Sequence, residues 1–96
     1  MRHVIVRYKL KADRVTEHEA LLARVFAQLQ EEKPEGLRYE AWKLADGVSF
    51  VHLARVSVPG NPLVSLSAFK AFTADVADRC VDPPVSTDAT VAHSFP

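Results

Sequence analysis

The first part of the chain alternates apolar and polar residues, and this period of two predicts a β-strand. From His3 to Lys11 every second side chain is apolar, so the apolar side chains share one face of an extended segment. The β-branched residues in this segment also favour a strand. The apolar face consists of Val4, Val6, Tyr8 and Leu10.

Helical spacing replaces the alternation after residue 15. Thr16 and Glu19 match a capping box, in which the two side chains each bond a free backbone N–H, so we expect a helix to begin at Thr16. Pro34 disfavours helical geometry in the residue before it, and the helix should therefore end near Glu32. The apolar stripe of this helix consists of Leu22, Val25, Phe26 and Leu29.

Residues 36–56 form the segment with the clearest pattern, and they predict a β-hairpin. Two runs rich in Val, Tyr, Trp and Phe flank Asp46-Gly47, a pair typical of the two-residue type I′ turn. This loop would place Trp42 opposite Val51, and side chains alternate between the two faces. One face carries Tyr39, Ala41, Lys43, Phe50, His52, Ala54 and Val56, and the other carries Arg38, Glu40, Trp42, Leu44, Ser49, Val51, Leu53 and Arg55.

A turn-rich segment after the hairpin precedes a second predicted helix. Asn61 is a good cap for a helical turn because a proline follows it. We expect the second helix to span residues 65–79, with Cys80 at the C-terminal end of its apolar stripe. Asp75 and Arg79 lie four residues apart and are expected to pair on the surface of this helix.

The segment Asp82-Pro83-Pro84 should end the second helix and lead into a last strand over residues 85–95. The order β-α-β-β-α-β predicts an α+β, ferredoxin-like fold: a four-stranded antiparallel sheet with two helices on one face. The other face then has no cover, and an exposed apolar patch is typical of an interface. We therefore infer a homodimer in which two sheets pack into a dimeric α+β barrel. The residues expected at this interface are Trp42, Val51, Leu53 and Ile5.

Length and composition narrow the class of protein. A chain of 96 residues predicts one domain over residues 1–96 with a modest core. Twelve basic and twelve acidic residues give a formal net charge of zero, which argues against a nucleic-acid partner. The single cysteine allows no internal disulfide, and no apolar run suits a signal peptide or a membrane span. These features predict a cytoplasmic protein.

Three segments carry a resemblance to a known family. Gly36-Leu37-Arg38-Tyr39-Glu40 is similar to that family's glycine followed by a Tyr-Glu strand, Phe50-Val51-His52-Leu53 is similar to its aromatic third strand, and Ala68-Phe69-Lys70-Ala71-Phe72 is similar to its Phe-rich second helix. Over nearly its whole length the chain resembles the antibiotic-biosynthesis-monooxygenase-like (ABM) domains of the dimeric α+β barrel superfamily.

The resemblance implies a homodimer whose subunits each hold a pocket between sheet and helices. Some members of the family oxidise polycyclic aromatic compounds with molecular oxygen and no cofactor, and others degrade haem. The haem-degrading members resemble one another in an Asn, Trp and His set. The first strand of this chain has no asparagine, and Trp42 lies on a strand instead of a helix. Haem degradation is therefore not expected.

His52 is the first candidate for chemistry because it shares a predicted face with Tyr39 and, on the adjacent strand, with Tyr8. An imidazole beside a phenol in a semi-apolar cavity can move a proton from a phenolic or enolic substrate, whose carbanion can react with oxygen without a metal. The alternative is a core histidine with one hydrogen bond. We expect no metal or other cofactor, because the histidines and Cys80 lack metal-ligand spacing. The expected pocket lining is Phe26, Phe50, Phe69 and Phe72.

The remaining candidates have simpler interpretations. Arg38 and Arg55 lie opposite each other in the predicted register and either form an anion site or pair with Glu40. Cys80 is expected to be a small core residue. The histidines at positions 3, 18 and 93 receive no catalytic role: His3 is expected to be exposed, His18 has Leu22 instead of a second ligand four residues on, and His93 lies near the chain end.

These observations favour a cofactor-independent monooxygenase that acts on a small aromatic or carbonyl compound near Tyr8, Tyr39 and His52. One alternative is a non-catalytic homodimer that binds a small ligand or is purely structural, with its pocket filled by phenylalanines. A third is an isomerase or dehydratase that uses the same histidine.

Overall fold

A computed structural model describes residues 1–96 and has the element order predicted from the sequence. None of its helices is both long and apolar enough to cross a bilayer. The strands are β1 (Arg2–Leu10), β2 (Leu37–Lys43), β3 (Ser49–Val56) and β4 (Cys80–Ala89), and the α-helices are α1 (Val15–Glu32) and α2 (Ser67–Ala74). Three short 3₁₀ turns connect them: η1 (Ala12–Arg14), η2 (Pro62–Ser65) and η3 (Ala77–Arg79).

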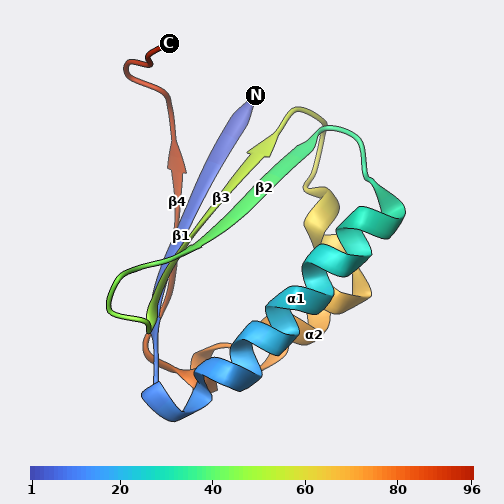
Figure 1. Cartoon of the computed structure of the whole chain (residues 1–96). Coiled ribbons are helices and arrows are strands. Elements are labelled where there is room, and N and C mark those ends of the chain that lie inside the picture. Colours follow the sequence, from blue (N-terminus) through green and yellow to red (C-terminus); the bar gives the residue numbers. More distant parts are fainter.

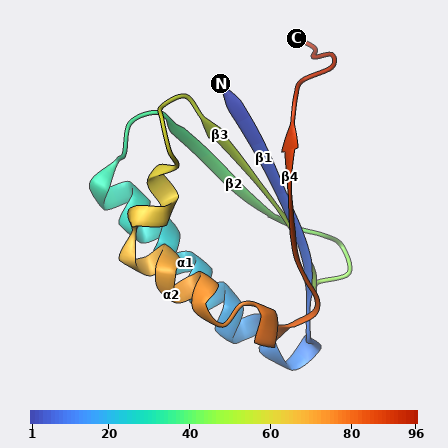
Figure 2. The ribbon, with the colours of Figure 1, turned by 180° about the vertical axis from the view of Figure 1, so that it is seen from behind.

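The four strands form one antiparallel sheet in the order β2-β3-β1-β4. Figures 1 and 2 show α1 and α2 side by side on one face of this sheet, with the opposite face uncovered by any other part of the chain. The predicted α+β, ferredoxin-like class is therefore confirmed. Both chain ends lie at the same end of the sheet (Figure 1).

The register of the β2–β3 hairpin is the one predicted, with Trp42 opposite Val51. Its turn is different, because only Gly47 takes a positive φ, whereas a type I′ turn needs two such residues. The Leu44 carbonyl accepts a hydrogen bond from the Gly47 N–H. The Asp46 carboxylate accepts bonds from the backbone N–H groups of Val48 and Ser49. These bonds stabilise a longer loop.

The predicted capping box at the start of α1 is wrong. The 3₁₀ turn η1 runs directly into the helix, so Arg14 occupies the cap position, and no side chain caps the helix. The Arg14 guanidinium instead pairs with Glu17 at 2.9 Å, while Thr16 lies inside the helix with an exposed side chain. The predicted C-terminal end at Glu32 is confirmed, and Lys33 after it is left-handed, with φ 45°.

The second helix and the last strand differ from the prediction. The expected helix over residues 65–79 is divided into η2, α2 and η3, and β4 begins at Cys80, five residues earlier than predicted. Pro83 and Pro84 lie within β4, which tolerates them because it is an edge strand and not every N–H needs a partner. The strand ends at Ala89, so the C-terminal residues 91–95 do not extend its face. The cap at Asn61 is confirmed, since its side chain accepts a hydrogen bond from the Leu63 N–H.

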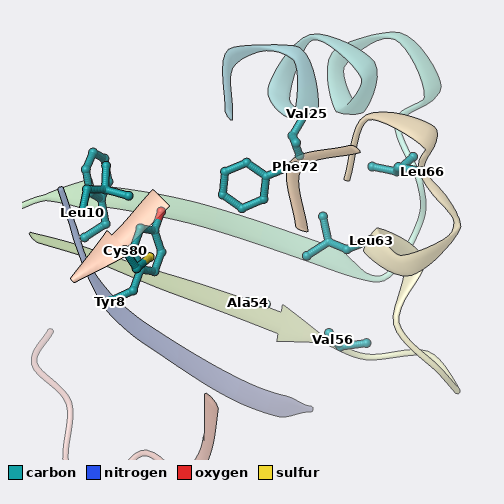
Figure 3. Close-up of a cluster of buried hydrophobic side chains, with 10 residues drawn as sticks. Tyr8, Leu10, Val25, Ala54, Val56, Leu63, Leu66, Phe72 and Cys80 are labelled. Carbon is teal, nitrogen blue, oxygen red and sulfur yellow. The ribbon is translucent and has the colours of Figure 1, made fainter. Parts of the chain in front are cut away.

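The core lies between the helices and the sheet face that the alternation predicted to point inward. Figure 3 shows buried side chains from the sheet, from the helices and from η2 converging in this space. Every second residue of β3 is buried, as expected for a strand with one covered face. The buried apolar residues are Tyr8, Leu10, Val25, Phe50, Ala54, Val56, Leu63, Leu66, Phe72 and Cys80.

Gly36, at the entry to β2, is required by both its backbone and its surroundings. Its φ is +76°, and a Cβ there would collide with the Val58 side chain. Gly47 has nearly the same φ, +77°, but open space around it. We expect Gly47→Ala to lower the free energy of unfolding by about 1 kcal/mol through backbone strain alone. Gly36→Ala should lower it by about 2 to 4 kcal/mol because the clash adds to the strain. Urea unfolding of both variants measures this difference, and equal losses would contradict the proposed collision.

Candidate functional site

A cavity of about 240 Å³ lies between the inner face of the sheet and α2. Its wall is mostly apolar, and no Asp, Glu, Lys or Arg side chain lines it. The titratable residues in its lining are Tyr8, Tyr39 and His52, and the neutral polar ones are Asn61, Thr73 and Ser86. Apolar cavities with a few convergent polar groups are the usual form of small-molecule sites. The apolar lining includes Val4, Val6, Ala54, Phe69, Phe72 and Val76.

The structure brings together the three residues that the sequence placed at the candidate site. They come from three adjacent strands, Tyr8 from β1, Tyr39 from β2 and His52 from β3. The Tyr8 hydroxyl lies 2.7 Å from His52 Nε2, and the Tyr39 hydroxyl lies 2.5 Å from His52 Nδ1. Both nitrogens of the His52 ring are therefore hydrogen-bonded to tyrosines, in place of the single bond of the core-histidine alternative.

His18 joins this cluster, although the sequence analysis gave it no role. The side chain comes from α1 and is fully buried, and its Nε2 lies 2.6 Å from the Tyr8 hydroxyl. Its Nδ1 accepts a hydrogen bond of 3.1 Å from Arg79 Nε. Its helical spacing could have predicted its burial, because His18 lies three residues after Val15 and seven before Val25, on the buried stripe of the helix.

Arg79 is the second residue that sequence reasoning missed. Its side chain is 1% exposed, and its guanidinium donates to the Phe72 carbonyl at 2.6 Å and lies 5.4 Å from the centre of the Phe72 ring. The predicted pair with Asp75 does not form, because α2 ends at Ala74 and η3 turns Arg79 inward. The guanidinium is thus buried with no carboxylate partner.

Burial determines the protonation states of the cluster. It lowers the pKa of His52 to about 4, and burial followed by the charge of Arg79 lowers the pKa of His18 to about 4. Burial also raises the pKa of Tyr8 and of Tyr39 well above the ordinary value for a phenol. At neutral pH both histidines are uncharged and both tyrosines keep their protons.

The four phenylalanines expected to line the pocket separate into two groups. Phe69 and Phe72 line the cavity without filling it. The other two do not line it: Phe50 stacks on Tyr8 with ring centres 5.6 Å apart, and Phe26 stacks on Tyr39 at 5.2 Å and faces an outer groove. Phe50 lies against Tyr8 because the two residues are paired across β3 and β1, and Phe26 reaches Tyr39 from α1.

The outer face of the sheet carries the residues predicted for a dimer interface. Trp42 is 57% exposed, and Ile5, Val51 and Leu53 are half-buried beside it. Arg38 lies opposite Arg55, as predicted. Within the chain Glu40 pairs with neither, because its carboxylate accepts a hydrogen bond from Trp42 Nε1 at 3.4 Å.

The other candidates from the sequence lie apart from the cavity. Cys80 is buried in the core, as predicted, although it begins β4 instead of ending a helix. His93 is exposed beyond the end of β4, and His3 is half-buried on β1. No group of three His, Cys, Asp or Glu side chains is arranged to hold a metal ion.

Comparison with known proteins identifies the architecture. No family model and no curated protein matches the sequence. Among solved structures, Rv0793 from Mycobacterium tuberculosis is 20% identical, covers 99% of this chain and 98% of its own, and has a TM-score of 0.74. A protein provisionally named an antibiotic biosynthesis monooxygenase, from Bacteroides thetaiotaomicron, is 16% identical over 96% of this chain and 90% of its own, with a TM-score of 0.80. The chain has the fold of the antibiotic biosynthesis monooxygenases.

The likeness covers the whole antibiotic-biosynthesis-monooxygenase fold and not one motif. A variant of SnoaB from Streptomyces nogalater, described as a cofactor-independent oxygenase, covers 99% of this chain and 96% of its own at 15% identity, with a TM-score of 0.72. Identities this low establish the architecture, so the chemistry has to be argued from the residues of this chain.

The two buried histidines predict a loss of stability in mild acid. The pKa of each falls from 6.5 to about 4 on folding. Between these values the unfolded chain binds protons that the folded chain does not, so the free energy of unfolding decreases as the pH is lowered through this window. We expect a loss on the order of 2 to 3 kcal/mol for each histidine, measured by urea unfolding between about pH 7 and pH 4. His52→Gln should reduce the pH dependence of the free energy of unfolding to that expected for His18 alone. A free energy of unfolding that does not change with pH in the wild type would contradict the lowered histidine pKa values.

Proposed function

We propose that the chain is a cofactor-independent monooxygenase that acts on a small aromatic or carbonyl compound bound in the central cavity. The observation that carries this proposal is the hydrogen-bonded group Tyr8, His52 and Tyr39 in the wall of a mostly apolar cavity. Buried polar side chains need a hydrogen-bond partner for every polar atom, as they have here, and they replace apolar side chains that would stabilise a small core. Such a group is more typical of a site that handles protons than of a core built for stability alone.

The proposed chemistry needs the substrate as an anion. A phenol or enol that loses its proton places electron density on a ring or α carbon, and this carbon can transfer electrons to molecular oxygen. The superoxide and the carbon radical formed by this transfer combine in a C–O bond, and uptake of a proton gives a hydroperoxide. Where the same carbon also bears a hydrogen, loss of water leaves a carbonyl, so one oxygen atom enters the product and the other leaves as water. The Tyr39 hydroxyl, which is hydrogen-bonded to His52, would bind the substrate oxygen, and the apolar wall would exclude water from the reacting carbon.

The cavity volume limits the size of the substrate. Pockets for drug-sized ligands begin near about 300 Å³. A volume of about 240 Å³ therefore suits a compound of one or two rings. We propose one- and two-ring phenols and enolisable dicarbonyl compounds as the substrate class.

Binding without catalysis is the second candidate function, and the low pKa of His52 favours it. An imidazole whose pKa is about 4 is a weak base at neutral pH, so it takes a proton from a substrate reluctantly. If the substrate binds already ionised, the oxygenase does not need His52 to remove a proton. A protein that only binds its ligand has no need of a base.

We also propose that the protein is a homodimer formed through the outer face of the sheet. Trp42 is more than half exposed there, beside the half-buried Ile5, Val51 and Leu53. Exposed aromatic and aliphatic side chains on one flat face are typical of protein interfaces. A second sheet packed against this face would bury them.

Oxygen uptake tests the proposed activity. We expect the purified protein to bind at least one compound from a panel of one- and two-ring phenols and enolisable dicarbonyls, and to consume oxygen in proportion to the carbonyl product. Tyr39→Phe removes only a hydroxyl and should lower kcat/KM about 100-fold or more. His93→Gln changes an exposed residue outside the site and serves as control. Binding without oxygen uptake would favour the binding function instead.

Sedimentation velocity tests the proposed dimer. Trp42→Arg places a charge in the proposed interface and should shift the protein to a monomer. Val64→Arg is the matched control, because Val64 is also 57% exposed but lies in η2 on the helical side of the molecule. A monomeric wild type, or a Trp42→Arg variant that still dimerises, would contradict the proposed interface.

A further inference from the structure

Two buried side chains, His18 and Arg79, contact the proposed catalytic group only through Tyr8. Together with it they form one unbranched series of hydrogen bonds that links Arg79, His18, Tyr8, His52 and Tyr39 in this order. The series begins at a buried guanidinium and ends at a tyrosine in the cavity wall. Its direction follows from the chemistry of the first donor.

A guanidinium can only donate hydrogen bonds, so the Arg79 Nε–H requires His18 Nδ1 to be the acceptor. An uncharged imidazole with an accepting Nδ1 carries its proton on Nε2, and this N–H donates to the Tyr8 oxygen. Tyr8 has one O–H hydrogen, which it donates to His52 Nε2. His52 then carries its proton on Nδ1 and donates to Tyr39.

The last hydroxyl in the series is left with a free hydrogen. Tyr39 accepts from His52 and makes no other side-chain hydrogen bond, so its own O–H has no acceptor in the protein. Tyr39 also lines the cavity. A ligand in the cavity therefore meets Tyr39 as a hydrogen-bond donor.

The series cannot easily be reversed. If Tyr39 donated to His52, then His52 would donate from Nε2 to Tyr8, and two arrangements would follow. In one, Tyr8 accepts from both histidines and its own buried O–H has no acceptor. In the other, every bond is reversed and His18 presents an N–H to the Nε–H of Arg79, so that two donors face each other. Each arrangement leaves buried polar hydrogens without an acceptor, which costs their desolvation. Arg79 thus imposes the direction on all the residues that follow it.

The buried charge of Arg79 also favours a ligand that offers Tyr39 a hydrogen-bond acceptor. Arg79 is the one buried side chain that carries a permanent charge, no carboxylate pairs with it, and no acidic side chain lines the cavity. A buried charge without a partner is costly, and an anion nearby reduces the cost. A negative oxygen at Tyr39 would also be stabilised by a series of dipoles that all point toward it.

We propose that Arg79 and His18 are positioning residues that hold this one-way series, and that its open end at Tyr39 binds the oxyanion of a phenolate or enolate. The inference deepens the proposed function, because it narrows the substrates to phenols and enols acidic enough to ionise near neutral pH. Two classes are excluded as good ligands. Phenols without activating groups stay neutral and offer Tyr39 a weaker acceptor, and amines are cations.

The tautomers of the two histidines give the first test, which needs no substitution and no ligand. Long-range ¹H–¹⁵N spectra of the wild-type protein at neutral pH should show His18 with its proton on Nε2 and His52 with its proton on Nδ1. A proton on Nε2 of His52, or a charged imidazole at either position, would overturn the one-way series. Because no reaction is measured, this result is independent of whether the protein consumes oxygen.

Binding of 4-nitrophenol gives the second test, since its phenolate absorbs visible light and its neutral form does not. We expect the ratio of phenolate to phenol for the bound dye to be about tenfold higher than for free dye at the same pH, equivalent to one unit of pKa. Tyr39→Phe should return the ratio to that of free dye. Phe69→Leu, which changes the cavity wall without a hydrogen bond, should weaken binding of both forms alike and keep the ratio.

The role of Arg79 is tested with Arg79→Gln, which removes the charge and can still donate from an amide. The phenolate preference should fall severalfold in this variant, while His52 keeps its proton on Nδ1 if the amide reaches His18. An unchanged preference, or a dye that binds wild-type protein only in its neutral form or not at all, would overturn the anion site. A confirmed anion site without oxygen uptake would leave this inference standing and remove the oxygenase proposal.

Discussion

The Tyr8 hydroxyl is the contact on which the rest of the site depends. It lies between His18 of α1 and His52 of β3, at 2.6 and 2.7 Å, and so connects the first helix to the middle of the sheet. Loss of this oxygen would leave two buried imidazole nitrogens without partners, and such groups are costly. No buried side-chain nitrogen or oxygen lacks a partner as the chain stands. The hydroxyl thus joins α1 to the sheet through hydrogen bonds, and it is also the central member of the polar series.

Arg79 explains why the cluster has a direction as well as a composition. Tyrosines and neutral histidines can each donate or accept, so a series made of them alone could run in either direction. A guanidinium only donates, and its burial beside Phe72 holds it in one place. In a chain of only 96 residues, a core selected for stability alone would have apolar side chains here, because buried charges are rarely stabilising. Local costs of this kind are characteristic of functional sites.

Much of the fold could be predicted because it rests on repeating patterns. The alternation in β1 and in the hairpin set the inward face, and with it the convergence of Tyr8, Tyr39 and His52. The errors lie at element ends, where short-range signals compete. Pro83 and Pro84 indicated a break, but they stand in an edge strand where an N–H is dispensable. Thr16 matched a cap, yet the preceding 3₁₀ turn had already started the helix.

The sequence by itself determined the order of the elements, the sheet face that carries each side chain and three of the five members of the series. These follow from periodicity, which a strand or helix has before it packs. Only the tertiary structure decided that His18 and Arg79, 61 positions apart, meet beside Tyr8. Their contact depends on how α1 lies on the sheet and on the end of α2 at Ala74, which turns Arg79 inward. A hydrogen bond between side chains of different elements leaves no periodic trace in a sequence, because its geometry arises from packing.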